Sequence, residues 1–279
     1  NFTQNEYTLN VFSAHGTVTK TPNKLTYTYG EEVALSVTSD TGWTFSGWTP
    51  ALIDNKVTIS GDTTVTAIFT QNEYALDVTI VGNGSVTRDN NGPYHLNDVV
   101  TLTPAAVTGW TFTGWTPALT ENKVTISGDT AVTATFTQDE YSLTLNKVGE
   151  GTVSAIPANA HYHFGDEVEV TAIAAVGWSF ESWSANVTAG KVTITGDTTV
   201  TANFTINSFT LNYIAGTSGT LTGNPSQTVS YGKDGTEITA VPNPGYYFVD
   251  WSDGVLTASR IDKNITTNLS VTANFAHNG

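Results

Sequence analysis

The motif GWTFSGWTP at residues 42–50 decides the fold, because the chain repeats it three more times. It returns as GWTFTGWTP at 109–117, as GWSFESWS at 177–184 and as GYYFVDWS at 245–252. We call these segments the aromatic motifs. Each has a tryptophan close to its last residue, and these tryptophans are Trp48, Trp115, Trp183 and Trp251. They are 67, 68 and 68 residues apart. A fixed period with its own set of aromatic residues predicts an array of small, similar domains.

The segments around the aromatic motif alternate between apolar and polar residues. Before it, Tyr7, Leu9 and Val11 alternate with polar residues. After it, VTAIFT at 65–70 alternates in the same way, and similar segments recur at 132–137, 200–205 and 271–276. A period of two residues predicts half-buried strands, and we find no helix-length stretch with a period of 3.6 residues. The sequence therefore predicts an all-β protein.

Within the aromatic motif, Trp43 and Phe45 share parity along a strand, whereas Trp48 does not. A β-bulge just before the last tryptophan would bring all three rings to one face of the strand. The residues at that position in the four motifs are Gly47, Gly114, Ser182 and Asp250. We therefore expect a bulge that does not depend on glycine.

We expect four β-domains of about 67 residues each, with bounds at 7–70, 74–137, 141–205 and 209–276. Residues 1–6 are expected to be a remnant of a preceding repeat or a linker, because the sequence from Phe2 to Tyr7 resembles that from Phe69 to Tyr74. Counted from the Thr that ends each domain, the connections are the four-residue segments 70–73, 137–140 and 205–208, and they contain neither Gly nor Pro. Linkers this short favour an elongated, semi-rigid rod.

The charge balance argues against two classes of partner. The chain has 25 acidic and 10 basic residues, which gives a net charge of −15. Because no basic patch is present, binding to the phosphates of nucleic acid is not expected. No apolar run approaches the 18 residues that insertion into a membrane needs. We interpret the scattered acidic residues as a source of solubility and self-repulsion.

The aromatic residues have two interpretations. Most lie in alternating strands, which favours a structural core. The predicted core residues are Trp48, Trp115, Trp183, Trp251, Phe45, Phe112, Phe180, Phe248, Phe69, Phe136, Phe204 and Phe275. The ring directly after the first glycine of each motif is a possible ligand-facing aromatic, able to stack on a sugar. These residues are Trp43, Trp110, Trp178 and Tyr246.

Two pairs of polar residues have the spacing of chemical sites. His161 and His163 would share one face of a strand, a spacing that can hold a metal, but no third ligand presents itself. Asp250 and Asp253 could act as the paired carboxylates of a glycosidase. The other three repeats have no acidic residue at the position of Asp250, so we favour ordinary surface roles.

Two further features also have simple interpretations. The segment 89–92, with sequence DNNG, could offer oxygens to Ca²⁺ but is also typical of a turn. A lysine recurs before the fifth strand of three repeats, where a crosslink to Asn could form, although a solvated charge is the simpler interpretation. These lysines are Lys56, Lys123 and Lys191. We expect no catalytic residue, no cofactor and no metal.

All four repeats resemble the divergent bacterial relatives of the internalin B-repeat, the Listeria–Bacteroides repeats. The family pattern is Y-x-L-x-V, a G-T/S-V strand, Y-x-x-G-x-x-V, G-Y/W-x-F-x-x-W and a final V-T-A-x-F. The fourth repeat follows it from Gly245 to Trp251 and from Val271 to Phe275 despite insertions. The resemblance implies a spacer or adhesion module of a large exported or surface-attached protein, and it implies no catalytic residues.

We therefore expect a structural segment of a bacterial extracellular or cell-surface protein that serves as a stalk, spacer or filament shaft in adhesion. Its partners would be the neighbouring repeats of a longer chain. One alternative is a multivalent module that binds carbohydrate or matrix. Another is a homotypic, filament-forming subunit whose partners are copies of itself. An enzyme is not expected, because an active site is normally singular and almost everything in this chain is repeated.

Overall fold

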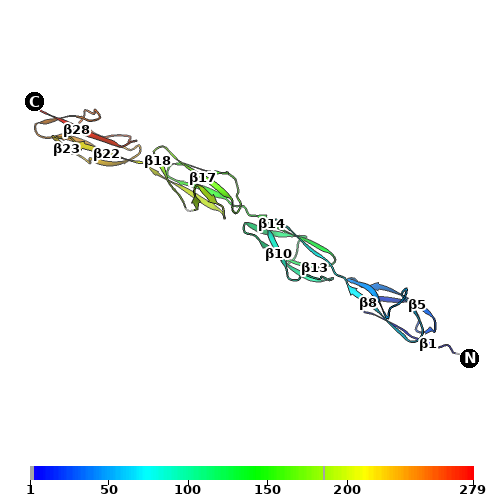
Figure 1. Ribbon diagram of the computed structural model, residues 1–279. Helices are drawn as coiled ribbons and strands as arrows, with labels where there is room; N and C mark the ends of the chain where they lie inside the picture. The colour runs from blue at the N-terminus through cyan, green and yellow to red at the C-terminus, as the bar shows by residue number, and fades with distance from the viewer. Residues whose placement is uncertain (1–2, 185) are drawn as a thin grey trace. The chain divides into compact units, whose positions relative to one another are not determined.

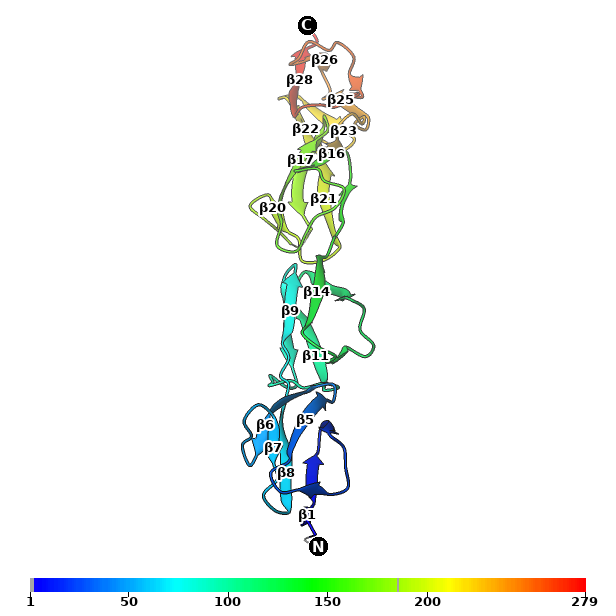
Figure 2. The same ribbon diagram turned by 90° about the vertical axis from the view of Figure 1, so that its right-hand side faces the viewer.

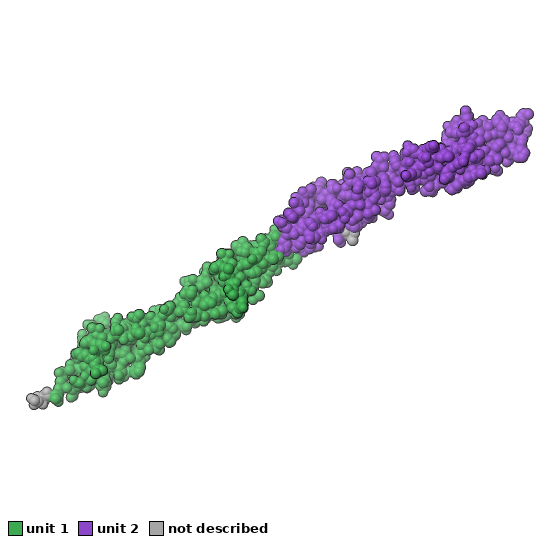
Figure 3. Space-filling model, turned by 180° about the vertical axis from the view of Figure 1, so that it is seen from behind, with its two compact units in different colours: residues 1–138 green, residues 139–279 purple. Residues whose placement is uncertain are grey.

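The computed structural model describes residues 3–184 and 186–279. Phe2, and with it the start of the predicted remnant at 1–6, lies outside the described residues. Contacts divide the chain into two compact units, residues 1–138 and 139–279, coloured green and purple in Figure 3. The regular elements of the described residues are β-strands, and no helix that could cross a membrane occurs among them. The predicted all-β class is confirmed.

The first repeat folds as two three-stranded sheets and one short strand pair (Figure 1). One sheet has the order β2-β8-β6, in which β2 runs parallel and β6 antiparallel to β8. The other sheet, β3-β5-β7, is antiparallel, and β1 pairs with β4. The strands are β1 (Glu6–Tyr7), β2 (Leu9–Ser13), β3 (Gly16–Thr21), β4 (Tyr27–Thr28), β5 (Glu32–Ser39), β6 (Trp43–Thr49), β7 (Lys56–Thr58) and β8 (Thr63–Gln71).

The second repeat has the same topology. Its sheets have the orders β12-β14-β9 and β10-β11-β13, and β9 lies parallel beside β14 (Figure 2). A single bridge between Tyr74 and Tyr94 takes the place of the short strand pair. The strands are β9 (Leu76–Val81), β10 (Gly84–Arg88), β11 (Val99–Ala106), β12 (Trp110–Thr116), β13 (Lys123–Thr125) and β14 (Thr130–Gln138).

The third repeat has sheets of order β15-β21-β18 and β16-β17-β20-β19. The fourth has β23-β25-β27 and a four-stranded sheet, β24-β22-β28-β26, in which β24 covers the edge of β22. The strands are β15 (Leu143–Val148), β16 (Gly151–Ile156), β17 (Glu167–Ala174), β18 (Trp178–Trp183), β19 (Val187–Thr188), β20 (Lys191–Thr193), β21 (Thr198–Ile206), β22 (Ser208–Ala215), β23 (Gly219–Thr222), β24 (Ser226–Ser230), β25 (Ile238–Pro242), β26 (Tyr246–Trp251), β27 (Ser259–Arg260) and β28 (Leu269–His277).

The predicted bulge occurs in every repeat. In the first, the register between β6 and β8 shifts between Phe45 and Gly47, and the equivalent strand pairs shift at the same place. The shift is also present where Ser182 and Asp250 replace glycine. The extra residue changes the parity of the strand, so Phe45 and Trp48 point to the same side and their rings meet edge to face, with centroids 5.1 Å apart.

Each repeat has its own core between its two sheets. In the first, Leu9 and Val65 come from one sheet, and Val33, Leu35 and Val57 come from the other. Alternation explains this, because successive residues of a strand point to opposite faces and only one face meets the partner sheet. The fourth repeat builds the same arrangement from Leu211, Ile238, Val271 and their neighbours.

A side-chain oxygen ties the first strand of each repeat to the turn before its last strand. Oδ1 of Asp62 accepts the backbone N–H of Thr8 at 2.7 Å. These hydrogen bonds from the Thr8 backbone and hydroxyl lower the pKa of Asp62. The equivalent pairs in the other repeats are Asp129 with Ala75, Asp197 with Ser142, and Asn268 with Thr210. This contact closes each repeat over more than fifty residues of sequence.

The predicted core residues occupy a range of depths. Trp48, Trp115, Trp251, Phe136 and Phe204 are buried. Most of the others are partly buried against these cores; they are Phe45, Phe69, Phe112, Trp183, Phe248 and Phe275.

Phe180 departs from the expectation, because its side chain is 38% exposed. Its ring still contacts Trp183, at a centroid distance of 5.3 Å. In the first two repeats, Leu52 and Leu119 pack against the core, and Val187 has this position in the third repeat. Because valine is smaller than leucine, it covers less of the aromatic rings of the third repeat.

Candidate functional site

The last tryptophan of the motif is fixed at its polar end in the first two repeats. The indole Nε1–H of Trp48 donates a hydrogen bond to Oδ1 of Asn55 at 2.8 Å, and Trp115 does the same to Asn122 at 2.8 Å. Asn55 and Asn122 have φ of 57° and 58°, a conformation that Asn adopts more readily than most residues. These rings are therefore held inside their own repeats and offer no free face to a ligand.

The other two repeats vary this contact. In the fourth, Trp251 donates to the backbone carbonyl of Thr257 at 3.1 Å. In the third, Gly190 stands at the position of Asn55 with φ of 76°, so the turn is kept but the side-chain acceptor is lost. The sequence pattern did not reveal this bond, although the Asn-Lys pairs at 55–56 and 122–123 were a visible signal.

The four possible ligand-facing aromatics are half-buried and lie against their own repeats. Trp43 stacks on His15, with ring centroids 3.4 Å apart and planes 3° apart. The rings of Trp110 and Trp178 lie against backbone: a Cβ added at Gly82 would come within 2.9 Å of Trp110, and one at Gly149 within 2.8 Å of Trp178. In the fourth repeat, Tyr246 meets His277 edge to face at 5.3 Å. Each of these rings thus has a contact within its own repeat, and the stacked pair of Trp43 and His15 covers one face of Trp43.

A glycine at the start of the second strand accommodates the phenylalanine that ends each repeat. A Cβ on Gly84 would lie 2.5 Å from the ring of Phe136, closer than real side chains approach. The same clash would arise at Gly151 and Gly219, whereas a Cβ on Gly16 would lie 3.0 Å from the Phe69 ring and would overlap the carbonyl oxygen of Thr38. This glycine therefore makes room for a core ring.

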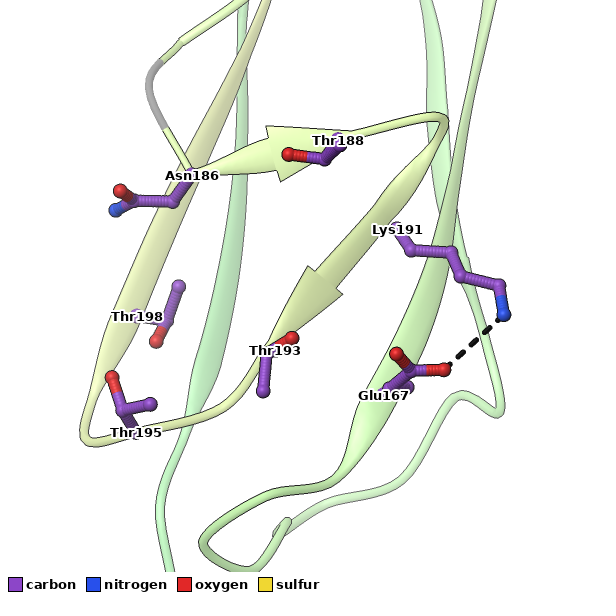
Figure 4. Close-up of a pocket in the computed structure, with 7 residues that line it drawn as sticks. All are labelled: Glu167, Asn186, Thr188, Lys191, Thr193, Thr195 and Thr198. Atoms are coloured by element: carbon purple, nitrogen blue, oxygen red, sulfur yellow. Dashed lines mark hydrogen bonds and ion pairs between the residues drawn. The ribbon is translucent and has the colours of Figure 1, made fainter.

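A polar recess of about 450 Å³ lies on the third repeat (Figure 4). Lys191 Nζ and Glu167 Oε2 form an ion pair of 3.2 Å on one side of it. A similar recess of about 460 Å³ in the first repeat includes Lys56 and Glu32. Hydroxyl, amide and charged groups line the recess in Figure 4, without an aromatic ring; these residues are Glu167, Asn186, Thr188, Lys191, Thr193, Thr195 and Thr198. Such a lining can hydrogen-bond a polar ligand but cannot stack on it.

The two histidines of the sequence analysis lie beside different carboxylates. Nδ1 of His161 is 3.9 Å from Glu140, and Nδ1 of His163 is 3.9 Å from Asp166. Within residues 3–184 and 186–279, no group of three or more His, Cys, Asp or Glu side chains is placed to hold a metal ion.

The remaining polar candidates are also engaged locally. Asp250 accepts a hydrogen bond from the side chain of Asn274 at 2.8 Å, whereas Asp253 pairs with Arg260, so the two carboxylates have separate partners. Oδ1 of Asp89 accepts the backbone N–H of Thr101 at 2.9 Å. Hydrogen bonds from Thr101 lower the pKa of Asp89.

The three recurring lysines each pair with a glutamate. The Nζ–Oε2 distances are 3.5 Å for Lys56, 2.6 Å for Lys123 and 3.2 Å for Lys191. Their glutamate partners are Glu32, Glu121 and Glu167. About half of each lysine side chain remains exposed, so these pairs have the environment of ordinary surface charges.

The linkers at 70–73 and 205–208 are hydrogen-bonded to the aromatic motif that precedes them. In the first unit, Asn72 donates its backbone N–H to the carbonyl of Gly42 at 2.8 Å, and the Thr44 hydroxyl donates to Oδ1 of Asn72 at 2.6 Å. In the second unit the same two bonds, at 2.8 and 2.6 Å, join Asn207 to Gly177 and Ser179. The turn that opens the aromatic motif therefore also anchors the linker.

Four consecutive segments of the chain, residues 7–73, 74–140, 141–208 and 209–279, match the family model of the divergent InlB B-repeat domain. The chain belongs to this family. No curated protein compared with the chain matches it. The four B-repeats cover the chain from Tyr7 onward, and membership supports a repeat-containing protein of the bacterial surface type.

The fourth B-repeat contains a buried cation that the sequence analysis missed. Arg260 lies opposite Ile238 across the strand pair, whereas in the first B-repeat Val57 lies opposite Val33. The Arg260 side chain is 6% exposed. The signal that could have revealed it is the replacement of the recurring Lys-Val-Thr strand by Ser-Arg-Ile at 259–261.

Two carboxylates and two rings surround the Arg260 guanidinium. Its Nη1 and Nη2 donate to Asp253 at 2.9 and 2.8 Å, and its Nε donates to Asp262 at 3.0 Å. It lies 5.3 Å from the Trp251 ring, and the Tyr213 hydroxyl donates to Asp262 at 2.6 Å. Hydrogen bonds from Arg260 lower the pKa of Asp253, and burial together with Asp262 raises the pKa of Tyr213. Every charge is paired, which is the condition for burying it.

Proposed function

We propose that this chain is a spacer segment of a bacterial surface protein, in which B-repeats set the distance between functional parts. The role is mechanical and non-enzymatic. What supports it is the nature of the repeated positions: they are core rings, turn glycines, the Asp or Asn that closes each repeat, and the Asn or Asp of each linker. Each of these residues maintains a domain or a junction, and none of them needs a ligand.

The observation that carries the proposal is the hydrogen bonding of the linkers. Asn72 and Asn207 use backbone and side chain to join the aromatic motif before them. A linker that is short and bonded to the preceding domain restricts the angle between neighbours, whereas a flexible tether would be rich in Gly and Ser. Restricted angles are what a spacer needs to keep its length.

The test measures the first junction directly. The chain contains no cysteine, so Thr64→Cys and Thr87→Cys, both exposed and in neighbouring repeats, allow two spin labels to be placed without background. A narrow distance distribution by pulsed electron paramagnetic resonance is expected. Asn72→Gly should broaden it, because both linker geometry and the Thr44 contact are lost, whereas Asn91→Gly, in a loop of the second repeat, should not. A broad distribution in the otherwise unchanged chain would argue against a spacer.

Solution scattering tests the whole chain. A compact globule of this length would have a radius of gyration of about 19 Å. We expect a value well above that, and a value near it would exclude the spacer. A glycan and matrix-protein binding screen runs in parallel: a signal that depends on Trp43, Trp110, Trp178 and Tyr246 would support the alternative of a multivalent binding module.

A further inference from the structure

The strands that begin and end each repeat are neighbours and run parallel. In the second repeat, β9 pairs with β14 from Leu76 opposite Thr130 to Val81 opposite Thr135 (Figure 2). The other repeats contain the same parallel pair, as β2 with β8, β15 with β21 and β22 with β28. We call it the terminal pair. The chain enters a repeat near the start of one of its strands and leaves at the end of the other.

The direction of these strands decides how a repeat responds to tension along the chain. A pull on the start of one parallel strand and on the end of its neighbour makes the two slide past each other. All hydrogen bonds of the pair are then loaded together, because parallel ladder bonds are evenly spaced. A pull on the same end of both strands loads one bond after another. The terminal pair is therefore arranged for the stronger of the two responses.

Sliding of the terminal pair would also disrupt the core. In the second repeat, Leu76 of β9 and Val132 of β14 are both buried in the same core. A shift of one residue would turn each of these side chains toward the wrong face of the sheet. A shift of two residues would move them out of a packed environment that tolerates little displacement. Core packing and ladder bonds therefore resist the same movement.

The ends of the terminal pair are held as well. The carboxylate of Asp129, just before β14, accepts the backbone N–H of Ala75 at 2.9 Å, and the carbonyl of Ala75 accepts the N–H of Thr130 at 2.9 Å. At the other end, β14 pairs with β12 as far as Gln138 opposite Trp110. The strand by which the chain leaves the repeat is thus bonded along both of its edges.

We propose that each B-repeat carries tension along the chain through shear of its terminal pair, which makes the array a load-bearing tether. This goes beyond the spacer role, because restricted angles preserve length only while nothing pulls on the chain. The second and third repeats have a neighbouring repeat on both sides. A pull along the chain therefore reaches their terminal pairs from both directions.

The test pulls on the second repeat of the full chain in two directions. The chain has no cysteine, so pairs of introduced cysteines define where DNA handles for optical tweezers attach. Ala75→Cys with Gln138→Cys loads the terminal pair in shear, whereas Ala75→Cys with Ala131→Cys pulls the two strands apart from one end. All three side chains are exposed. At the same loading rate we expect an unfolding force at least about twofold higher in shear.

Two proline variants in the shear arrangement test the ladder bonds themselves. The carbonyl of Ala75 bonds β14, and the backbone groups of a strand alternate between its two edges, so the N–H of Thr79 faces β14. The N–H of Ile80 faces the other edge, where β9 has no neighbouring strand among the described residues. Thr79→Pro should lower the unfolding force, because it removes a ladder donor. Ile80→Pro, on an open edge, should leave the force close to its original value.

Equal unfolding forces in the two pulling directions would overturn the proposal, since both measurements use the same folded repeat. It would also be overturned if Ile80→Pro lowered the force in shear as much as Thr79→Pro. Thermal unfolding shows whether each proline variant is folded. If Thr79→Pro is not, the two pulling directions decide alone. The distance distribution across the first junction is independent of these forces, so a failure here would leave the spacer role in place.

Discussion

The indole Nε1–H of Trp115 and Oδ1 of Asn122 are joined by a hydrogen bond of 2.8 Å. Trp115 is 9% exposed and belongs to the core of the second B-repeat, whereas Asn122 lies in a turn with φ of 58°. The bond therefore links the conformation of a surface turn to the position of a core ring. It also satisfies the one polar atom of a side chain that is otherwise apolar.

Asn122→Gly keeps the backbone conformation but removes the acceptor, as Gly190 does in the third repeat. We expect the free energy of unfolding of the second B-repeat to fall by about 1–3 kcal/mol, the cost of an unsatisfied buried donor. The indole signals of the seven tryptophans allow each repeat to be followed separately by NMR during urea denaturation. The first repeat, with Asn55 intact, is the internal control.

The reciprocal change, Gly190→Asn, should stabilise the third B-repeat by about 0.5–1.5 kcal/mol by giving Trp183 an acceptor. Space is available, because an added Cβ would lie 3.7 Å from the carbonyl of Val170, and Asn tolerates the φ of 76°. If neither substitution moves the urea midpoint of its repeat, the hydrogen bond contributes nothing to stability.

Gly84→Ala should destabilise the second B-repeat by about 1–3 kcal/mol, because the new methyl group would overlap the Phe136 ring in a packed core. Gly128→Ala is the matched control in the same repeat: an added Cβ there meets nothing within 4 Å, and we expect a change within about 0.5 kcal/mol. Thermal and urea unfolding measure both. Equal effects of the two substitutions would mean that loss of glycine, and not the clash, is responsible.

Acid should unfold the fourth B-repeat first. Asp253 has a pKa lowered by its hydrogen bonds from Arg260, so the folded state favours the ionised carboxylate. The stabilisation is complete above the unfolded-state pKa of about 3.9 and is lost as the pH falls from there through the folded-state pKa. Protonation of Asp253 would leave the buried Arg260 with one ionised carboxylate partner, Asp262. The Tyr213 hydroxyl, which donates to Asp262, and the Trp251 ring would remain near the guanidinium.

An NMR titration from pH 6 to pH 2.5 checks this prediction. The Trp251 indole signal should lose its native position at a higher pH than that of Trp48. Asp253→Asn should lower the stability of the fourth repeat at neutral pH and remove the loss of stability that otherwise sets in as the pH falls below the unfolded-state pKa of the carboxyl. Simultaneous loss of all the indole signals would show that the Arg260 cluster does not set the acid limit.

Trp115→Ala should cost about 3–5 kcal/mol, enough to unfold a domain of this size. Trp110→Ala should cost less, because Trp110 packs against the same core but is only half-buried. Denaturation of the two variants under the same conditions compares them. If Trp115→Ala melts like the unchanged chain, the core assignment of this ring is wrong.

The bulge before the last tryptophan could be predicted because it follows from parity alone. Phe45 and Trp48 are an odd number of residues apart, both are large and apolar, and one extra residue is the simplest way to bring them to one face. The Trp48–Asn55 bond could not be predicted in the same way. It depends on a turn whose φ values the sequence does not display and on the depth at which the ring settles.

The fourth repeat shows the limit of reading repeats by similarity. Its aromatic motif and final strand match the other three, so the same core is expected. Arg260 nevertheless takes the place of a valine, and it is tolerated because Asp253 and Asp262 reach it from flanking segments. A sequence shows that an arginine is present but does not show that two carboxylates converge on it.

The sequence by itself determined the period, the strand class and the family, because these depend on local alternation and on the recurrence of large rings. Tertiary structure alone decided which strands pair. The first strand of each repeat runs parallel to the last, as Leu9 opposite Thr63 and Leu76 opposite Thr130 show, across more than fifty residues of chain. Tertiary structure also decided that the Leu96 side chain of the second repeat packs against Gly42 of the first. Local pattern specifies which face of a strand is apolar, whereas the partner of that face is chosen by packing between residues far apart in sequence.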